Sequence, residues 1–352
     1  MSKKFLKIQN KTIGRGNPCF IVAEISGNHN QSFVKAKKIV EEACRAGVDA
    51  IKLQTYTADT ITINSNNKWF QVKSTNKEWV NQTLYELYKK AYTPWDWQPK
   101  LQKIAKKYGV ILFSTPFDET AVDFLEKMRV PAYKVASFEI GDLELLKKIG
   151  STKKPVIISR GMSDLADIKL AIKTLKNAGA PQIALLHCVS SYPAKPEEMN
   201  ISSISLLKNK LGIEVGLSDH NLDSSVDVAA IALGASIIEK HVTLRRSECG
   251  PDAAFSLEPE ELKKLVSDIR VAEKAMGKPQ LKAGKRESEN LVFRRSLFIV
   301  KDVKRGDIVT KNNIRSIRPG YGLQPKFLGK VLGKKFKISI KSGTPLSFKL
   351  IK

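Results

Sequence analysis

The sequence lacks the features that mark membrane-inserted and secreted proteins. No run of about 18 apolar residues is present, and the first ten residues have no apolar core like that of a signal peptide. Cysteine is scarce, and the 4 cysteines, Cys19, Cys44, Cys188 and Cys249, form no CxxC pair. We therefore expect a cytoplasmic protein with reduced thiols, without a disulfide framework or a zinc knuckle.

Acidic residues are also scarce relative to basic ones. The chain has 60 Lys and Arg against 35 Asp and Glu, a formal net charge of +25. Much of this excess is local, since from Leu281 onward 19 basic residues stand against 4 acidic ones, a net charge of +15. No zinc finger, RNP-type aromatic strand or basic helix accompanies these lysines. We expect a solvated basic surface that attracts small anions, and no nucleic-acid or membrane partner.

Stretches typical of buried strands recur along the chain and alternate with amphipathic stretches typical of helices. The predicted strands are residues 20–26, 50–55, 111–117, 132–137, 155–161, 183–188, 214–220 and 237–243. Eight parallel strands in roughly 250 residues predict a TIM (β/α)8 barrel, an α/β fold whose active sites lie at the carboxyl ends of the strands. A doubly wound open sheet is the alternative, although no GxGxxG motif follows the first strand.

The flanking regions predict two further parts. Residues 4–13 indicate a short strand or hairpin before the first core strand. We expect the barrel to span residues 1–277, because a predicted helix at 262–276 stops at Gly277. A polar linker without periodicity follows at 278–293, and residues 294–352 form a small β-rich domain with predicted strands at 296–300 and 336–340.

Two of the predicted strands end on histidine. His220 and His241 flank a predicted crossover helix at 225–234, so the two strands are parallel and the imidazoles lie at the same end of the barrel. With Asp219 and Glu239 close by, two neutral imidazoles suit a divalent cation that keeps open coordination positions. The alternative is two unrelated histidines, each bonded to a backbone carbonyl.

One connection is too long for a plain loop. Residues 57–94 separate the second strand from the next core helix, predicted at 95–108. Loops of this length in compact domains are usually lids or binding elements. An inserted helix at 78–91 that only packs on the barrel is the alternative, and both can hold.

Several motifs at the predicted strand ends resemble those of the sialic acid synthases. They are Glu24 with Asn28-His29-Asn30, Lys52-Leu53-Gln54-Thr55, Phe113-Ser114-Thr115-Pro116-Phe117, Ala132-Tyr133-Lys134-Val135-Ala136-Ser137, Ser159 with Gly161-Met162, Gly216-Leu217-Ser218-Asp219-His220, and Glu239-Lys240-His241. Residues 294–297 and 317–320 are similar to the C-terminal antifreeze-like (SAF, β-clip) domain of that family. Residues 52–60, 84–88 and 250–259 are closer to its pseudaminic acid synthase branch.

The resemblance implies an enzyme that condenses phosphoenolpyruvate with the open-chain aldehyde of a 2,4-diacetamido-2,4,6-trideoxy hexose, while water releases phosphate. It also implies a divalent metal ion (Mn²⁺, Mg²⁺ or Co²⁺) on His220 and His241, and a domain-swapped homodimer. A synthase using N-acetylmannosamine or a legionaminic acid precursor is an alternative. A polyanion-binding protein on an inactive barrel is an alternative of another class.

The implied site residues take distinct roles. Glu24 organises water or binds a sugar hydroxyl, although a salt bridge to a rim lysine is the simpler interpretation. Lys52 and Lys134 bind the anionic donor, because an unpaired lysine at the end of an apolar strand is costly to bury. The remaining implied substrate-binding residues are Gln54, Thr115, Ser137, Ser159, Ser190, Tyr192, Asp252 and Arg318.

Three positions depart from the family pattern. Arg160 replaces a small threonine after the strand that ends at Ser159, so it either adds an anion contact or points away. His187 and Ser190 combine features of the sialic and pseudaminic branches. These departures leave the acceptor sugar open without changing the reaction class.

Overall fold

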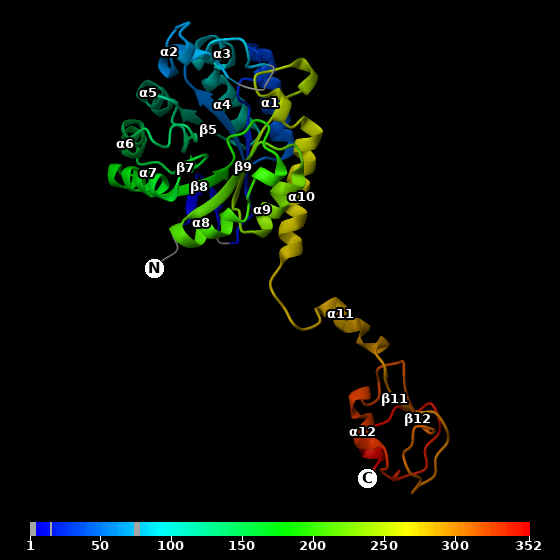
Figure 1. The fold of residues 1–352 in the computed structure, drawn as a ribbon. Coiled ribbons are helices and arrows are strands. Elements are labelled where there is room, and N and C mark those ends of the chain that lie inside the picture. Colours follow the sequence, from blue (N-terminus) through cyan, green and yellow to red (C-terminus); the bar gives the residue numbers. More distant parts are fainter. Residues whose placement is uncertain (1–4, 15, 74–77) are drawn as a thin grey trace. The chain divides into compact units, whose positions relative to one another are not determined.

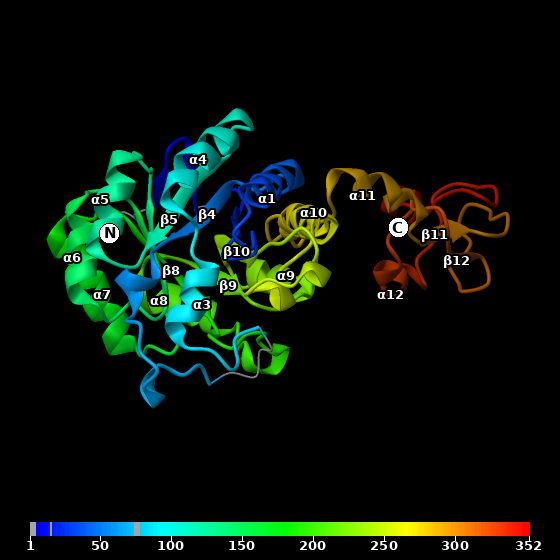
Figure 2. The same ribbon diagram turned by 90° about the horizontal axis from the view of Figure 1, so that it is seen from above.

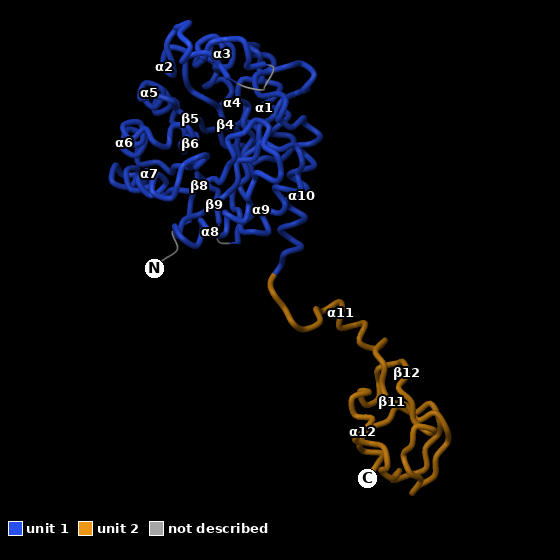
Figure 3. The backbone as a smooth tube through the Cα atoms, in the orientation of Figure 1, with its two compact units in different colours: residues 1–277 blue, residues 278–352 orange. Residues whose placement is uncertain are grey.

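The computed structural model describes residues 5–14, 16–73 and 78–352. The chain forms two compact units, Met1–Gly277 and Lys278–Lys352, which are coloured separately in Figure 3. Among the described residues, no helix is both long enough and apolar enough to cross a membrane.

The first unit is a closed barrel of eight parallel strands surrounded by helices (Figure 1). The strands are β3 (Phe20–Glu24), β4 (Ala50–Thr55), β5 (Ile111–Pro116), β6 (Tyr133–Val135), β7 (Val156–Ser159), β8 (Ile183–Cys188), β9 (Glu214–Asp219) and β10 (Ile237–His241). Each strand pairs with the next one in sequence, and β10 closes the ring by pairing with β3. The prediction of a TIM barrel is confirmed, and the open sheet is excluded.

Most of the helices follow a barrel strand and pack on the outside of the ring. They are α1 (Phe33–Ala46), α4 (Gln98–Lys107), α5 (Glu119–Lys127), α6 (Leu143–Ser151), α7 (Leu165–Ala178), α8 (Ser203–Leu211), α9 (Ser224–Ala232) and α10 (Pro259–Met276). Local side-chain and glycine signals set where these helices begin and end. In α1, the Ser32 side chain accepts a hydrogen bond from the Lys35 amide, and Gly47 ends the helix at a φ of 90°.

The amino-terminal end of the barrel is closed by a hairpin. Strands β1 (Leu6–Ile8) and β2 (Lys11–Ile13) pair antiparallel, in agreement with the prediction for residues 5–13, while Lys4 lies outside the described residues. The hairpin side chains pack against the first residues of several barrel strands, including Phe20, Ala50 and Ile237. The carboxyl ends of the strands are therefore the end that is left for a binding site.

The long connection after β4 contains two short helices, α2 (Ala58–Ile61) and α3 (Leu84–Ala91), and a 3-10 turn at Lys68–Phe70. Residues 74–77 of this connection lie outside the described part of the chain. Helix α3 is shorter than the predicted 78–91, because the Thr83 and Glu86 capping box starts it at Leu84. Figures 1 and 2 show α3 over the carboxyl end of the barrel strands.

The second unit is small and has its own core. It contains α11 (Lys285–Glu289), the antiparallel strands β11 (Ser296–Ile299) and β12 (Ile314–Ile317), and α12 (Leu328–Val331). The core consists of Leu297, Ile299, Val303, Val309, Ile314, Val331, Phe336, Leu346 and Ile351.

One prediction for this region was wrong. Residues 336–340 form no continuous strand, because Phe336 bridges to Ile351 whereas Ile340 bridges to Val303, so no single partner extends a ladder. The linker, predicted to be polar and without periodicity, contains the short helix α11. Its exposed Lys, Arg and Glu residues have sufficient helix propensity without an apolar face.

Candidate active site

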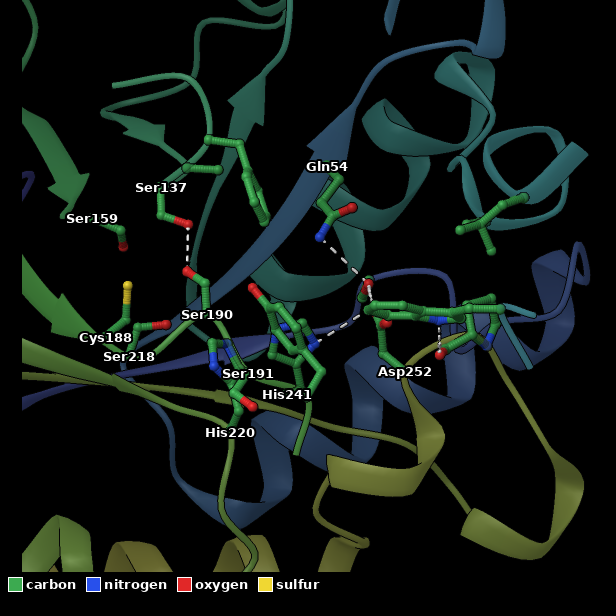
Figure 4. Close-up of a pocket in the computed structure, with 18 of the residues that line it drawn as sticks. Gln54, Ser137, Ser159, Cys188, Ser190, Ser191, Ser218, His220, His241 and Asp252 are labelled. Carbon is green, nitrogen blue, oxygen red and sulfur yellow. Dashed lines mark hydrogen bonds and ion pairs between the residues drawn. The ribbon is translucent and has the colours of Figure 1, made fainter. Parts of the chain in front are cut away.

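A cavity of about 1010 Å³ lies at the carboxyl end of the barrel. Figure 4 shows part of its lining, which comes from the ends of several strands and from the loops that follow them. Its lining includes the predicted residues Lys52, Gln54, Lys134, Ser137, Ser159, Ser190, Tyr192, His220, His241 and Asp252. One closed barrel thus brings together side chains from six different strands or their following loops.

Three predicted residues lie elsewhere. Glu24 is fully buried behind the lining, where its Oε1 accepts a hydrogen bond of 2.7 Å from the Ser26 amide. Thr115 is 1% exposed and is not one of the described lining residues. Arg318 follows β12 in the second unit. The roles of these three residues remain predictions.

Lys52 is held between two carboxylates. Its Nζ lies 2.9 Å from Glu24 Oε2 and 2.8 Å from Glu239 Oε1. Burial alone would lower the Lys52 pKa, but the two carboxylates outweigh it and raise that pKa above its ordinary value. The expectation that Lys52 is unpaired was therefore wrong, and the simpler interpretation of Glu24, a salt bridge to a rim lysine, is what the structure shows.

Lys134 has a different environment. Its Nζ donates hydrogen bonds to Ser159 Oγ at 2.6 Å and to the Val135 carbonyl at 2.9 Å. No salt bridge to Lys134 occurs within the described part of the chain. Burial lowers the pKa of Lys134 to about 8, although Glu239 opposes the shift. Lys134 is thus a buried ammonium at the cavity with a hydroxyl partner and room for an anion.

Glu239 pairs with a lysine and a serine side chain of the cavity and is not part of a cation site. Besides Lys52, it accepts a hydrogen bond of 3.0 Å from Ser218 Oγ. Burial raises the pKa of Glu239, but Lys52 and Lys134 outweigh burial and hold it at about 2. Asp219 also serves another partner, since the fully buried Lys240 lies 2.6 Å from it. The expectation that Asp219 and Glu239 support a cation on the histidines was wrong.

The two strand-end histidines lie side by side because β9 and β10 are neighbours. Their ring centroids are 5.3 Å apart. His220 Nδ1 donates to the Val189 carbonyl at 3.0 Å, so its Nε2 keeps the lone pair. His241 Nδ1 is buried without a hydrogen-bond partner, 3.7 Å from Asp252 Oδ2. The alternative of two backbone-bonded histidines holds for His220 but not for His241.

The charge state of these rings suits metal binding. Burial lowers the pKa of His220 to about 4, and burial together with His220 lowers the pKa of His241 well below its ordinary value. Both imidazoles are therefore neutral at pH 7 and have lone pairs to offer. Across the described ranges, no three His, Cys, Asp or Glu residues gather into a complete metal cage. The pair fits an ion that takes its other ligands from water or substrate.

Hydroxyl and amide groups complete the polar lining. Figure 4 shows Ser137 and Ser190 pointing toward one another, with 3.0 Å between their Oγ atoms. Asp252 accepts a hydrogen bond from Ser26 Oγ, and burial raises the pKa of Asp252 to about 6. The Tyr192 ring packs on His220 with centroids 4.4 Å apart. These groups surround the lysines and the imidazoles with hydroxyl donors and acceptors and with the Asp252 carboxyl group.

Sequence reasoning missed Glu139. This residue lines the cavity, and its Oε2 is buried without a hydrogen-bond partner. Burial raises the pKa of Glu139 to about 7, although the Lys134 ammonium opposes the shift. The signal was its position two residues after Ser137, on the loop that follows β6.

The departures at Arg160 and His187 lie outside the described lining. Arg160 Nε donates to His187 Nδ1 at 2.9 Å, and His187 Nε2 therefore donates to the Met199 carbonyl at 2.6 Å. Of the two possibilities considered for Arg160, an anion contact or an orientation away from the site, the structure shows the second.

Comparisons with known proteins agree with this geometry. Residues 39–281 match the NeuB family, and residues 294–352 match the SAF domain. The chain is 41% identical to the pseudaminic acid synthase of Campylobacter jejuni over 93% of this chain and 95% of that protein. It is 35% identical to the N,N'-diacetyllegionaminic acid synthase of Legionella pneumophila, over 96% and 95%.

A solved structure is similar to this chain in both fold and sequence. The N-acetylneuraminic acid synthetase of Leptospira borgpetersenii is 33% identical, with a TM-score of 0.71 over 82% of this chain and 95% of that one.

Proposed function

We propose a function from the premise that this chain belongs to the NeuB family. The enzyme condenses phosphoenolpyruvate with 2,4-diacetamido-2,4,6-trideoxy-L-altrose and water, and releases pseudaminic acid and phosphate. The observation that carries this proposal is the buried Lys134 ammonium, which has no carboxylate partner among the described residues and faces the cavity that also holds the imidazole pair. The 41% identity to a pseudaminic acid synthase supports the choice of sugar.

The lysine and serine side chains bind the donor. Lys134 and Ser159 supply a charge-assisted and a hydroxyl hydrogen bond to the phosphate or carboxylate of phosphoenolpyruvate. Ser137 and Ser190, which bond to each other, exchange that bond for the donor oxygens. Lys52 contributes positive charge from beneath while it stays paired with Glu239.

His220 and His241 hold the divalent cation. The neutral rings, the fixed tautomer of His220 and the unpartnered Nδ1 of His241 fit such an ion. Mn²⁺, Mg²⁺ and Co²⁺ suit two imidazoles with water ligands nearly equally. When bound, the ion supplies Lewis-acid polarisation of a carbonyl oxygen.

The remaining groups orient the acceptor and manage protons. C3 of phosphoenolpyruvate forms a bond to the aldehyde carbon, the aldehyde oxygen takes a proton, and water adds at C2 as phosphate leaves. Glu139, with a pKa of about 7 and a free oxygen, is suited to hold a proton during these transfers. Gln54, Tyr192 and Asp252 bind the sugar from the cavity lining, and Glu24, which is buried behind that lining, organises water only through its contact with Lys52.

We further propose a domain-swapped homodimer in a cytoplasmic enzyme, with Arg318 of one copy completing the site of the other. This part rests on the family resemblance alone. A mixture of Arg318→Ala and His220→Ala subunits tests it, because exchange of subunits would restore one intact site in a dimer of the two inactive variants. Two inactive variants that never complement would remove Arg318 from the partner's site.

The function is tested by phosphate release from phosphoenolpyruvate with three acceptors, with and without a chelator. We expect the highest kcat/KM with the L-altrose derivative and loss of activity on chelation. Preference for a legionaminic precursor or N-acetylmannosamine would support the alternative acceptors, as the 35% identity to a legionaminic acid synthase allows. Absence of phosphate release with all three would favour the polyanion-binding alternative.

A further inference from the structure

One face of helix α3 forms a wall of the cavity. Leu84, Leu87, Tyr88 and Ala91 all line the cavity, and their spacing of three, four and seven residues places them on one side of the helix. The opposite side is polar, with Glu86, Lys89 and Lys90 exposed. An apolar stripe of this kind usually packs on another element of the core, whereas here it faces a space open to small molecules.

Further apolar side chains extend the wall. The rings of Tyr56 and Phe117 are 5.0 Å apart, and those of Tyr56 and Tyr88 are 5.7 Å apart. Ile61 of α2 also lines the cavity. The cavity therefore has a mainly apolar wall, formed by α2, α3, Tyr56 and Phe117, and a polar side that carries Lys134 and the imidazoles. Gln71 and Lys73 of the long connection also line the cavity, outside this wall.

We propose that this wall binds the remote end of the acceptor, namely its 4-acetamido methyl and C6 methyl groups, and selects a 6-deoxy diacetamido hexose over a hydroxylated N-acetylhexosamine. The inference rests on the proposed function and deepens it. The aldehyde carbon must reach phosphoenolpyruvate on the polar side, so the far carbons of the open chain extend to the other side. Methyl groups gain free energy when they leave water for an apolar surface.

Rejection of the wrong acceptor follows from the same surface. A sugar with hydroxyl groups at C4 and C6 would place them against Leu84, Leu87 and Ile61, which offer no side-chain hydrogen-bond partner. Burying a hydroxyl without a partner costs free energy. The wall therefore selects the acceptor in two ways. It contacts the methyl groups of the preferred sugar, and it leaves the hydroxyl groups of the other sugar without a hydrogen-bond partner.

The test compares kcat/KM for the 2,4-diacetamido-2,4,6-trideoxy acceptor with kcat/KM for N-acetylmannosamine. Leu84 is half-buried, and Leu84→Asn changes the polarity of the wall while keeping the number and branching of the side-chain heavy atoms. We expect the ratio of the two values to fall by about tenfold, the usual effect of one apolar group on substrate selection. The matched control is Leu170→Asn on the exposed face of α7, where Leu170 is 48% exposed and the ratio should stay unchanged.

A second variant covers the case in which Leu84→Asn does not fold, as judged by thermal unfolding. Ile61→Thr replaces the ethyl group of the side chain with a hydroxyl and so changes the polarity of the same wall from α2. An unchanged ratio in the folded variants of an active enzyme would overturn the wall proposal alone. If the wild-type enzyme releases phosphate with neither sugar, the proposed function and the wall proposal fall together.

Discussion

Lys52 and Glu239 form a buried ion pair in which Nζ and Oε1 are 2.8 Å apart. The two residues belong to β4 and β10, which both neighbour β3, so the pair spans the central strand of three. Because the charge of Lys52 is shared with Glu239 and Glu24, anion binding in the cavity depends mainly on Lys134.

Replacing Lys134 with methionine should weaken phosphoenolpyruvate binding and leave the barrel folded. We expect KM for phosphoenolpyruvate to rise by about 10- to 100-fold, because a hydrogen bond to a charged group contributes about 1.5–3 kcal/mol. Steady-state kinetics at saturating sugar measure the change. Lys103→Met, on an exposed position of α4, is the control and should behave as wild type. An unaltered KM in Lys134→Met would contradict the assignment.

The pH dependence of donor binding should report the same lysine. The pKa of Lys134 is lowered to about 8, mainly by burial, so the ammonium loses its proton as the pH rises through 8. We expect kcat/KM for phosphoenolpyruvate to fall about tenfold per pH unit above that value, since kcat/KM reports the free enzyme. The decrease in kcat/KM above pH 8 should be absent from the pH profile of Lys134→Met. If it persists there, another group causes it.

Removing one imidazole should weaken metal binding, which can be measured without an activity assay. We expect His220→Ala to bind Mn²⁺ at least about tenfold more weakly than wild type, because it loses one of two protein ligands. Titration followed by the electron paramagnetic resonance of free Mn²⁺ measures this directly. His187→Gln is the matched control, since His187 lies outside the described lining and bonds to Arg160. Equal Mn²⁺ affinity in His220→Ala and wild type would refute the site.

Glu139→Gln should lower turnover more than binding. The substitution keeps the size of the side chain and removes its ability to hold a proton, so we expect kcat to fall by about 10²- to 10⁴-fold. KM for phosphoenolpyruvate should change little, because Lys134 and Ser159 remain. Glu144→Gln, at a surface carboxylate 72% exposed, serves as control. A wild-type kcat in Glu139→Gln would show that its carboxylate takes no part in proton transfer.

Gly216→Ala should destabilise the barrel. A Cβ at Gly216 in β9 would lie 2.3 Å from the Ile237 carbonyl oxygen in β10, and a backbone atom cannot move aside without disturbing the sheet. Overpacking of this kind costs about 1–3 kcal/mol of unfolding free energy. Chemical denaturation measures it. Gly329→Ala in α12, where a Cβ meets nothing within 4 Å, should be neutral or stabilising.

Much of the fold followed from local patterns. The eight strands and most barrel helices were predictable because apolar runs and periodic stretches alternate, and a βαβ repeat forces parallel neighbours. The same rule placed His220 and His241 together, since both end strands on either side of one crossover helix. The prediction of a strand at 336–340 was wrong because isolated bridges to two distant segments leave no pattern in the sequence.

The sequence by itself determined which side chains stand at the carboxyl ends of the strands. Only the tertiary structure decided how they pair: Lys52 with Glu239, Lys240 with Asp219, and Glu139 left without a partner at one oxygen. It also turned the apolar stripe of α3 toward the cavity. The physical reason is that the order of the strands, and the end of the barrel at which each strand finishes, follow from neighbouring segments along the chain. Charge pairing and burial instead depend on which strands become neighbours when the ring closes.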